Sequence, residues 1–346
     1  MDSLSKRGLN ARLRLLQSNG GIATIEGRRE KFISTALSGP AGGVTAAAYL
    51  SSRKELPNAI SLDMGGTSSD ICLIRNGRPA WTLDASVGGF PIRLPMMDIH
   101  TVGAGGGSVI WVDSGGGLRV GPQSAGSHPG PACYGFGGNM PTITDAHMEI
   151  GTLRPEFFKG KDIPIRPEAG TKVLAALGKP LGMSAGEVAA DALRVVNFHL
   201  AKEIRAATLA RGFEASECVL IPFGGAGPLH ACEVAKELSI VRILLPEAAG
   251  VLSALGASIA DNRYDFSHAF IHRVDSLPES EMKRGFERLD GLGREKLADF
   301  PARDIRLERS VDMRYLGQSF DINVPVKRDG EPLSPERLVE AFHLLH

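Results

Sequence analysis

Two aspartates and a run of glycine and hydroxyl residues stand together in the stretch 60–74, ISLDMGGTSSDICLI. Asp63 and Asp70 carry hard oxygen ligands of the kind that Mg²⁺ prefers. Between them lie residues whose backbone N–H groups and hydroxyls can bind an anion, namely Gly65, Gly66, Thr67, Ser68 and Ser69. Oxygen ligands for a cation beside donors for an anion are what a metal–phosphate complex needs. An ordinary hairpin with a polar turn is the alternative that these residues leave open.

A second glycine-rich stretch, residues 222–228 (PFGGAGP), could supply another part of the same site. The apolar run 218–221 before it predicts a buried strand, and residues 229–238 after it predict a helix. A strand, a glycine loop and a helix in this order can lay a nucleotide over the helix N-terminus. The backbone of Gly224, Gly225 and Gly227 is therefore a candidate nucleoside contact.

The stretch 38–43 (SGPAGG), which opens a helix over 44–50, has two interpretations. The free N–H groups of the helix N-terminus could meet a phosphate. The same glycines could instead allow close packing against a neighbouring element.

The glycine-rich centre of the chain, residues 84–145, contains further possible metal ligands: Asp98, His100, His128 and Asp145. Imidazole and carboxylate together suit several divalent ions. Their spacing matches no specific metal motif, so hydrogen-bonded structural roles are the alternative for each. Long loops of this kind inside a compact protein are usually functional or disordered, and the scattered aromatic residues argue for order.

Several elements must position these residues. Strands are expected over 60–62, 71–74 and 78–83, the last two joined by the hairpin signal Asn76-Gly77. The clearest helix runs over 185–211, with a capping box of Ser184 and Glu187 and a C-cap at Gly212. The remaining expected elements are strands at 108–112, 118–120, 241–245, 310–315 and 320–326, a small-residue helix at 250–260 and a charged helix at 279–299.

Composition excludes several classes of protein. The chain has 346 residues, of which 43% are hydrophobic, so it can bury a large core. Lys+Arg and Asp+Glu both number 39, and this balance provides no basic excess to attract nucleic acid or an anionic membrane. The four cysteines show no CxxC spacing, and there is no signal peptide and no apolar run long enough to span a membrane. We therefore expect a cytoplasmic protein with reduced thiols.

These motifs together carry a family resemblance. The stretches 62–70 and 223–230 resemble the second phosphate motif and the adenosine motif of the actin/Hsp70/sugar-kinase ATPases. More narrowly, the chain resembles the hydantoinase A / 5-oxoprolinase family from about residue 15 to 320. The stretches that carry this likeness are 17–21 (QSNGG), 37–43 (LSGPAGG), 98–108 (DIHTVGAGGGS), 129–134 (PGPACY) and 144–146 (TDA).

The resemblance implies an α/β fold of the actin/Hsp70/sugar-kinase (ribonuclease-H-like) type with a Gly-rich insertion, followed by a truncated C-terminal α+β segment. The expected domains are 1–56, as what remains of a first ATPase domain, 57–260, as the second ATPase domain, and 261–346. ATP and Mg²⁺ are the implied cofactors. Asp63 and Asp70 would hold the Mg²⁺, and Gly65, Gly66, Thr67 and Ser68 would hold phosphate oxygens. Gly224, Gly225 and Gly227 would contact the nucleoside.

The implied reaction is ATP-dependent opening of a cyclic amide such as 5-oxoproline or a hydantoin, through a lactam phosphorylated on its oxygen. Asp63 and His100 are the expected catalytic residues, with His100 as an acid/base or a substrate contact. The expected partners are a cyclic amide substrate and a second, hydantoinase B-type subunit or domain, in an oligomer.

The chain departs from the family pattern. It has one D-x-G-G-T motif, whereas the family also carries an upstream one, so the chain is expected to start inside the first domain and to stop short of the family's C-terminal end. A basic residue is expected where Phe136 stands, and an amide where His147 stands. Three alternatives stay open: a subunit of an ATP-dependent ketone carboxylase, a sugar or acid kinase, and a non-catalytic remnant or assembly subunit.

Overall fold

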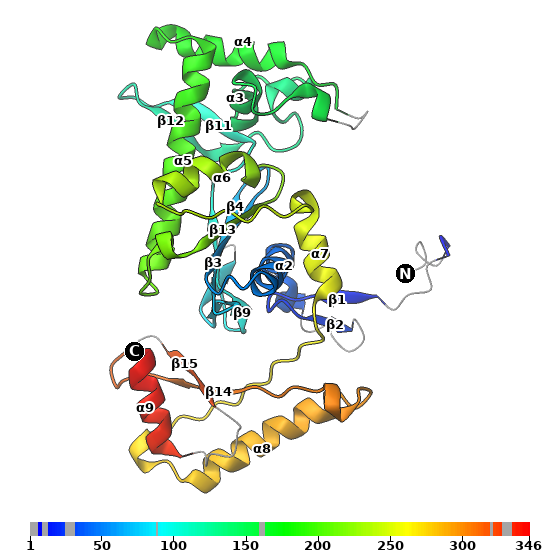
Figure 1. The fold of residues 1–346 in the computed structure, drawn as a ribbon, viewed down its shortest axis with the longest axis vertical. Helices are drawn as coiled ribbons and strands as arrows, with labels where there is room; N and C mark the ends of the chain where they lie inside the picture. Colours follow the sequence, from blue (N-terminus) through cyan, green and yellow to red (C-terminus); the bar gives the residue numbers. More distant parts are fainter. Residues whose placement is uncertain are drawn as a thin grey trace. The chain divides into compact units, whose positions relative to one another are not determined.

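A computed structural model of the chain describes residues 6–8, 13–24, 32–87, 89–158, 163–318, 321–326 and 334–346 (Figure 1). Tertiary contacts group the chain into two units, Met1–Arg263 and Tyr264–His346. Each unit has its own hydrophobic core. None of the helices in the described ranges combines the length and the apolar character needed to cross a membrane.

The strands of the first unit are β1 (Arg14–Leu16), β2 (Ile22–Thr24), β3 (Ala59–Met64), β4 (Ser69–Arg75), β5 (Arg78–Pro79), β6 (Trp81–Thr82), β7 (Ala85–Val87), β8 (Phe90–Ile92), β9 (Met96–Met97), β10 (Ile99–Val102), β11 (Ser108–Val112), β12 (Leu118–Ser124) and β13 (Val219–Phe223). Its α-helices are α2 (Ser38–Arg53), α3 (Ile143–Glu149), α4 (Pro167–Gly178), α5 (Ala185–Leu209), α6 (Gly227–Glu237) and α7 (Leu252–Ile259). Short 3₁₀ helices are η1 (Phe32–Thr35), η2 (Ala132–Tyr134), η3 (Pro155–Phe157), η4 (Lys179–Leu181), η5 (Ala215–Glu217) and η6 (Ala249–Val251).

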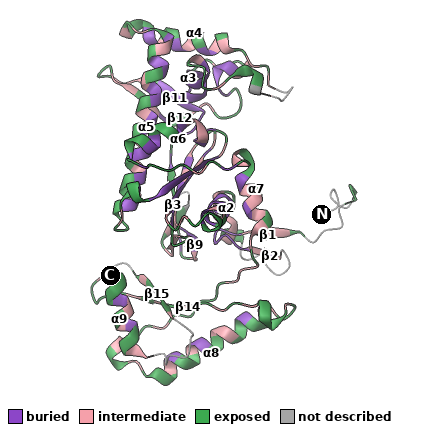
Figure 2. Cartoon of the chain, in the orientation of Figure 1, coloured by how far each residue is buried: buried purple, intermediate pink, exposed green. Residues whose placement is uncertain are grey.

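A mixed sheet in the order β10-β4-β3-β13 forms the centre of this unit, and β5 adds a short pairing to β4. Alternate residues of each strand point to opposite faces. Ile60, Leu62 and Met64 of β3 pack with buried residues of α5 and α6 on one face. Ala59 of the same strand and Phe223 of β13 pack with α2 and α7 on the other face. Figure 2 shows the buried residues concentrated on the strands and on the sides of the helices that face them.

A local capping box and a regular apolar stripe explain why α5 is the clearest helix in the sequence. It begins with the predicted capping box, in which the Ser184 side chain accepts from the Glu187 N–H and the Glu187 carboxylate accepts from the Ser184 N–H. Its buried residues form one continuous stripe that includes Val188, Val196 and Ile204. The helix ends at Leu209 with Ala210 as its C-cap, two residues before the predicted C-cap, and Gly212 has the left-handed φ of +74° that favours glycine.

The glycines of α2 serve close helix packing. A side chain at Gly256 of α7 would stand 1.8 Å from the carbonyl oxygen of Gly42, and one at Gly43 would stand 2.3 Å from the ring of Phe223. The small residues predicted to favour close helix contact at 250–260 do so, with α2 as the partner helix. Of the two interpretations of the stretch 38–43, the structure therefore shows the packing one for Gly42 and Gly43.

The strands near the aspartates differ from the predicted ones in their bounds. β3 continues to Met64 and β4 begins at Ser69, so both aspartates lie within strands. The expected strand 78–83 is divided, because only Arg78–Pro79 pair with β4 while Trp81–Thr82 pair with β9. The Ala80 N–H still donates to the Leu73 carbonyl of β4 at 2.7 Å, and the chain then leaves β4 to pair with β9.

The expected strand 241–245 was also wrong as a regular strand. It contributes a single bridge, Leu220 to Ile243, beside the edge strand β13. The Leu220 N–H donates to the Arg242 carbonyl at 3.1 Å, and the Leu244 N–H donates to the Leu220 carbonyl at 2.9 Å.

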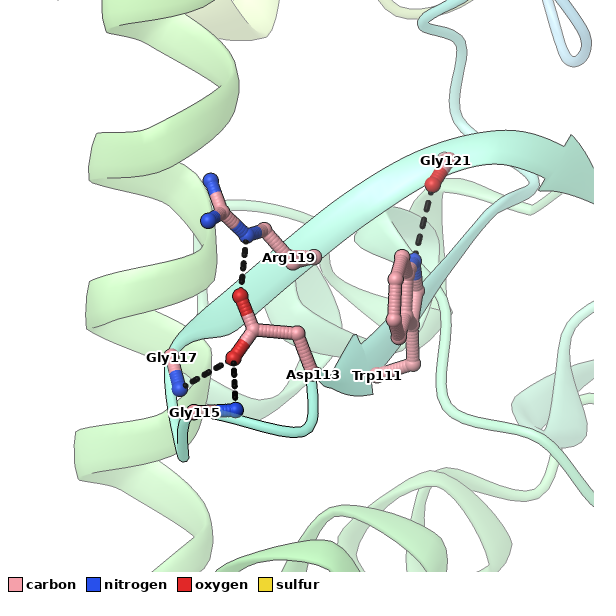
Figure 3. Close-up of polar contacts among 6 residues, drawn as sticks. All are labelled: Trp111, Asp113, Gly115, Gly117, Arg119 and Gly121. Atoms are coloured by element: carbon pink, nitrogen blue, oxygen red, sulfur yellow. Dashed lines mark hydrogen bonds and ion pairs between the residues drawn. The ribbon is translucent and has the colours of Figure 1, made fainter.

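The β11–β12 hairpin is closed by its own side chains (Figure 3). The Asp113 carboxylate accepts from the N–H groups of Gly115 at 3.0 Å and Gly117 at 2.8 Å, and from Nε of Arg119 at 2.7 Å. The Trp111 indole N–H donates to the Gly121 carbonyl at 2.8 Å. These contacts fix the hairpin that follows the glycine run 103–107.

The second unit holds η7 (Val274–Ser276), α8 (Glu279–Lys296), η8 (Ala302–Asp304), β14 (Arg309–Met313), β15 (Ile322–Val326) and α9 (Pro335–Leu345). β14 and β15 form an antiparallel pair. Its core contains Met282 and Phe286 of α8, Val324 of β15, and Leu338 and Phe342 of α9. The charged helix and both strands expected here are present, although Phe320, the predicted start of the second strand, lies outside the described residues.

The predicted division of the chain into three domains, 1–56, 57–260 and 261–346, stays a prediction. Contacts separate the units after Arg263. They also join α2 to β3 and α7 within the first unit, so residues predicted to belong to a separate 1–56 segment pack with the central sheet.

Candidate functional site

The two aspartates are direct cross-strand neighbours. In the antiparallel pairing of β3 with β4, Asp63 lies opposite Asp70, and in the pairing of β4 with β10, Asp70 lies opposite Thr101. All three side chains point to the same face of the sheet because directly opposed residues share a face. The Thr101 hydroxyl donates to the Asp70 carboxylate at 2.6 Å. The two aspartates thus flank the turn at 65–68, as the sequence pattern suggests, and lie side by side across the two strands.

Burial disfavours the ionised form of both carboxyls. Desolvation, and then the charge of Asp70, raises the pKa of Asp63 from its ordinary 3.8 to about 6. Desolvation also raises the pKa of Asp70, and the hydrogen bond from Thr101 opposes that rise. Two half-buried carboxylates in such a pair repel one another unless a proton or a cation lies between them. The pair is therefore suited to hold a divalent cation.

The turn after β3 is held from behind by the glycine run 103–107. The carbonyls of Gly65 and Gly66 accept from the N–H groups of Gly106 at 2.9 Å and Gly107 at 2.6 Å. A side chain at Gly105 would stand 2.7 Å from the backbone of the turn, so only glycine permits this approach. The turn is thereby fixed through its carbonyl groups.

Within the described part of the chain, most of the amide groups of the turn are left unpaired, unlike its carbonyl groups. Gly65 donates to the Ser68 carbonyl at 3.1 Å, whereas the N–H groups of Gly66, Thr67 and Ser68 have no acceptor among the described residues. A side chain built at Gly66 would meet nothing within 4 Å. Three unpaired donors beside open space and two carboxylates form the arrangement that a metal-bound phosphate fits.

The second glycine loop reaches the same carboxylate. Gly224 has φ +82°, and a side chain there would stand 2.4 Å from Oδ1 of Asp63. The Ala226 N–H donates to the Met64 carbonyl at 2.9 Å, and α6 begins at Gly227. A side chain at Gly225 would meet nothing within 4 Å. The structure thus brings together the two stretches that the sequence pattern proposed as one site.

His100 lies outside this group. It is paired with Ile71 across β10 and β4, and Ile71 belongs to the core that contains α5, on the opposite face from Asp63. Its Nε2 lies 3.1 Å from a carboxylate oxygen of Glu203 in α5. The alternation of side chains along β10 therefore sets His100 apart from Asp63, and its expected role as an acid/base or a substrate contact stays a prediction.

The other possible metal ligands are dispersed. Asp98 forms an ion pair with Arg211, and the ring of His128 lies 5.7 Å from that of Phe136. The Asp145 carboxylate accepts from the N–H groups of Ala132, Cys133 and Thr142 and from the Thr142 hydroxyl. Within the ranges that the structure describes, no three His, Cys, Asp or Glu side chains are placed to hold a metal ion.

Thr101 and Thr144 are site residues that the sequence did not reveal. Thr101 belongs to β10, a strand that the glycine-rich composition around it concealed. Thr144 donates its N–H at 2.7 Å and its hydroxyl at 2.8 Å to the Gly106 carbonyl, and so supports the glycine run behind the turn. The GAGGG sequence at 103–107 was the available signal, since such a run permits close backbone contact.

Known proteins resemble this chain in sequence over most of its length. The sequence profile of the hydantoinase/oxoprolinase family matches residues 1–266. Caprolactamase subunit alpha of Pseudomonas jessenii is 34% identical, over 96% of this chain and 49% of its own length. A 5-oxoprolinase of Saccharomyces cerevisiae is 35% identical, over 92% of this chain and 26% of its own length. The chain thus spans about half or less of these relatives.

Two solved structures are similar over nearly the whole chain. The crystal structure of the ATP-dependent caprolactamase from Pseudomonas jessenii has a TM-score of 0.86 and 33% identity, covering 100% of this chain and 51% of that one. The nucleotide-free structure of an acetone carboxylase, described as carrying out ATP-dependent acetone carboxylation, has a TM-score of 0.76 and 27% identity, covering 99% of this chain and 50% of that one.

Proposed function

The chain belongs to the hydantoinase/oxoprolinase family, and from this premise we propose that it is the Mg-ATP-binding part of an enzyme that opens cyclic amides. The observation that carries the proposal is the meeting of three features at Asp63. Asp70 lies opposite its carboxylate, unpaired amides follow it in the turn, and the Gly224 loop packs against it. This set of groups also favours an actin/Hsp70/sugar-kinase-like ATPase fold for the first unit.

Each group has a role in this proposal. Asp63 and Asp70 hold Mg²⁺ or its waters, and the amides of Gly66, Thr67 and Ser68 with the hydroxyls of the last two hold phosphate oxygens. Gly65 shapes the turn, while the small size of Gly224, Gly225 and Gly227 leaves room for the nucleoside on the backbone. When bound, Mg-ATP supplies a phosphoryl group for the lactam oxygen and a cation that offsets its charge. The protein's part is to orient these groups.

A cyclic amide is the substrate class best supported, because the names of two relatives, caprolactamase and 5-oxoprolinase, denote enzymes that act on cyclic amides. His100 faces α5, so we give it no part in the phosphate site.

A subunit of a ketone carboxylase is the second candidate, supported by the likeness to acetone carboxylase. ATP consumption stimulated by a lactam, or instead by a ketone with bicarbonate, distinguishes the two. In either case we propose that a second subunit or domain and an oligomer complete the enzyme, since the relatives are about twice as long or longer.

The first prediction concerns Mg-ATP binding by this chain. The turn at Gly66 and the loop at Gly225 both lie beside open space in this chain, and exposed charge pairs contribute only about 0–1 kcal/mol each. We expect calorimetry to show weak, magnesium-dependent binding of ATP by this chain. We expect markedly tighter binding by a version extended with the upstream domain of a relative.

Two outcomes would contradict this. Equal, tight affinity in both proteins would show that the added domain is irrelevant. No binding by either protein would remove the nucleotide assignment and favour a non-catalytic assembly subunit.

A further inference from the structure

Two buried histidines meet between α3 and α6. Nε2 of His147 lies 3.2 Å from Nε2 of His230, with the rings 4.7 Å apart and nearly perpendicular. His230 is 0% exposed and His147 is 3% exposed. Nδ1 of His230 lies 2.7 Å from Oδ1 of Asn197 in α5, and Nδ1 of His147 lies 2.7 Å from the Thr152 hydroxyl. The four side chains form one continuous chain of hydrogen bonds.

This chain of contacts sets the tautomer of each ring. The Asn197 carbonyl oxygen accepts, so His230 carries its proton on Nδ1 and its Nε2 accepts. His147 then donates from Nε2 and accepts at Nδ1 from the Thr152 hydroxyl, which lies 2.7 Å from Nδ1 and also 3.1 Å from the His147 carbonyl oxygen, a second acceptor for the same proton. A neutral imidazole has one donor and one acceptor, and both are used in both rings. Burial keeps the rings neutral by lowering the pKa of His147 to about 4 and that of His230 to about 3.

His147 is connected to the phosphate turn through α3. Thr144, three residues before it in the same helix, holds the Gly106 carbonyl with two hydrogen bonds. Gly106 and Gly107 in turn hold the carbonyls of Gly65 and Gly66. A displacement of α3 therefore displaces the support behind the turn amides.

His230 is connected to the second glycine loop through α6. It is the fourth residue of that helix, which starts at Gly227 directly after the loop. The Ala226 N–H holds the Met64 carbonyl at the end of β3. A displacement of α6 therefore displaces the loop that packs against Asp63.

We infer that the His147–His230 pair is a positioning device that holds the phosphate turn and the Gly224–Gly227 loop at a fixed separation. The inference rests on the proposed function, since the two loops are the two sides of that nucleotide site. Buried polar pairs with every group satisfied specify one arrangement of the elements that carry them, which apolar packing does less strictly. The amide that the family resemblance leads one to expect at position 147 could make the same kind of contact.

The test compares variants of the whole chain by two measurements. Amide hydrogen exchange at Gly106, Gly107 and Ala226 reports the two loops without any nucleotide, and calorimetry reports Mg-ATP affinity. His147→Leu removes the contact, His147→Gln retains a polar group near the position of Nε2, and Thr208→Val is the control. Thr208 is a buried residue of α5 whose hydroxyl donates to the Arg205 carbonyl at 3.0 Å, within the same helix.

We expect His147→Leu to raise exchange at all three amides at least tenfold and to weaken Mg-ATP binding about tenfold, and His147→Gln to restore both. Thr208→Val should lower the melting temperature and leave exchange at these amides and the affinity within twofold of the wild type. If His147→Leu does not fold, Thr152→Val, at an exposed position, should raise exchange at the same amides by a smaller factor.

Unchanged exchange at Gly106 and Ala226 in a folded His147→Leu variant overturns the inference, even if Mg-ATP binds. If His147→Leu does not fold, unchanged exchange in Thr152→Val overturns it in the same way. Raised exchange at these amides in a chain that binds no Mg-ATP overturns the proposed function and leaves the positioning role intact.

Discussion

Asp63 has a carboxylate neighbour across the strands and no hydrogen-bond donor among the described residues. This excludes, for those residues, the structural role in which it would cap the amides of the turn. A half-buried carboxylate that the fold leaves without a donor is costly unless a cation compensates it. Its position is therefore explained better by binding than by stability.

The prediction for this residue is that Asp63→Asn in the complete enzyme lowers ATP turnover by a factor on the order of 10² or more. Because the folded-state pKa is raised to about 6, Asp63 stabilises the fold below its unfolded pKa of 3.8 and loses that contribution as the pH rises through about 6. The amide should thus match or raise the melting temperature at pH 8, and the gain should vanish below pH 4. A variant that melts lower and retains its rate per folded molecule would contradict the assignment.

The histidine pair gives the opposite dependence on pH. The folded-state pKa values of His147 and His230 are depressed from the ordinary 6.5 to about 4 and about 3. The two neutral histidines therefore contribute their full stability above pH 6.5, and this stability is lost as the pH falls from 6.5 through the folded-state values. Each histidine contributes a slope of about 1.4 kcal/mol per pH unit between the two values.

Denaturant titrations between pH 7 and 4.5 measure this slope. His147→Gln should have a shallower loss of unfolding free energy than the wild type because one titrating group is gone. Parallel curves for the two proteins would show that the pair does not stay neutral in the fold.

At the scale of elements, the local signals in the sequence predicted α5, its capping box and the hairpin around the aspartates. These features depend on neighbouring residues and on regular apolar spacing, which the sequence displays directly. β10 was missed because four residues within a glycine-rich region carry no such signal. Only its pairing with β4 makes it a strand, and that pairing sets His100 on one face and Thr101 on the other.

The contact between α2 and α7 gives a prediction at this scale. A side chain at Gly256 would stand 1.8 Å from the Gly42 carbonyl, whereas one at Gly250, just before α7, would meet nothing within 4 Å. Gly256→Ala should destabilise the first unit by about 1–3 kcal/mol, the usual cost of overpacking a tight contact. Gly250→Ala is the matched control, and denaturant unfolding of both variants measures the difference. Equal stability of the two variants would contradict close packing between these helices.

At the scale of the whole molecule, sequence motifs identified the two walls of the site, but they could not show that the walls meet. Asp63 and Gly224 are distant in sequence, and their contact exists because the edge strand β13 pairs in parallel with β3. The pairing of β10 with β4 separates His100 from Asp63. Sequence spacing alone contains neither result.

The central claim is that Mg-ATP binds where the turn amides, Asp63 and the Gly224–Gly227 loop converge. Gly66 is suited to test it because a side chain there meets no protein atom within 4 Å and its backbone does not require glycine. A valine at this position would occupy the space assigned to a phosphate. Gly186 in the first turn of α5 has equally open space and contacts neither loop, so Gly186→Ala is the control.

The measurement is the calorimetric affinity for Mg-ATP of the wild type, Gly66→Val and Gly186→Ala, with melting temperatures recorded for all three. We predict that Gly66→Val keeps the melting temperature within a few degrees of the wild type and weakens binding at least tenfold, while Gly186→Ala binds as the wild type does. Undiminished binding by a folded Gly66→Val variant would contradict the account, because the phosphates would then lie somewhere other than this turn.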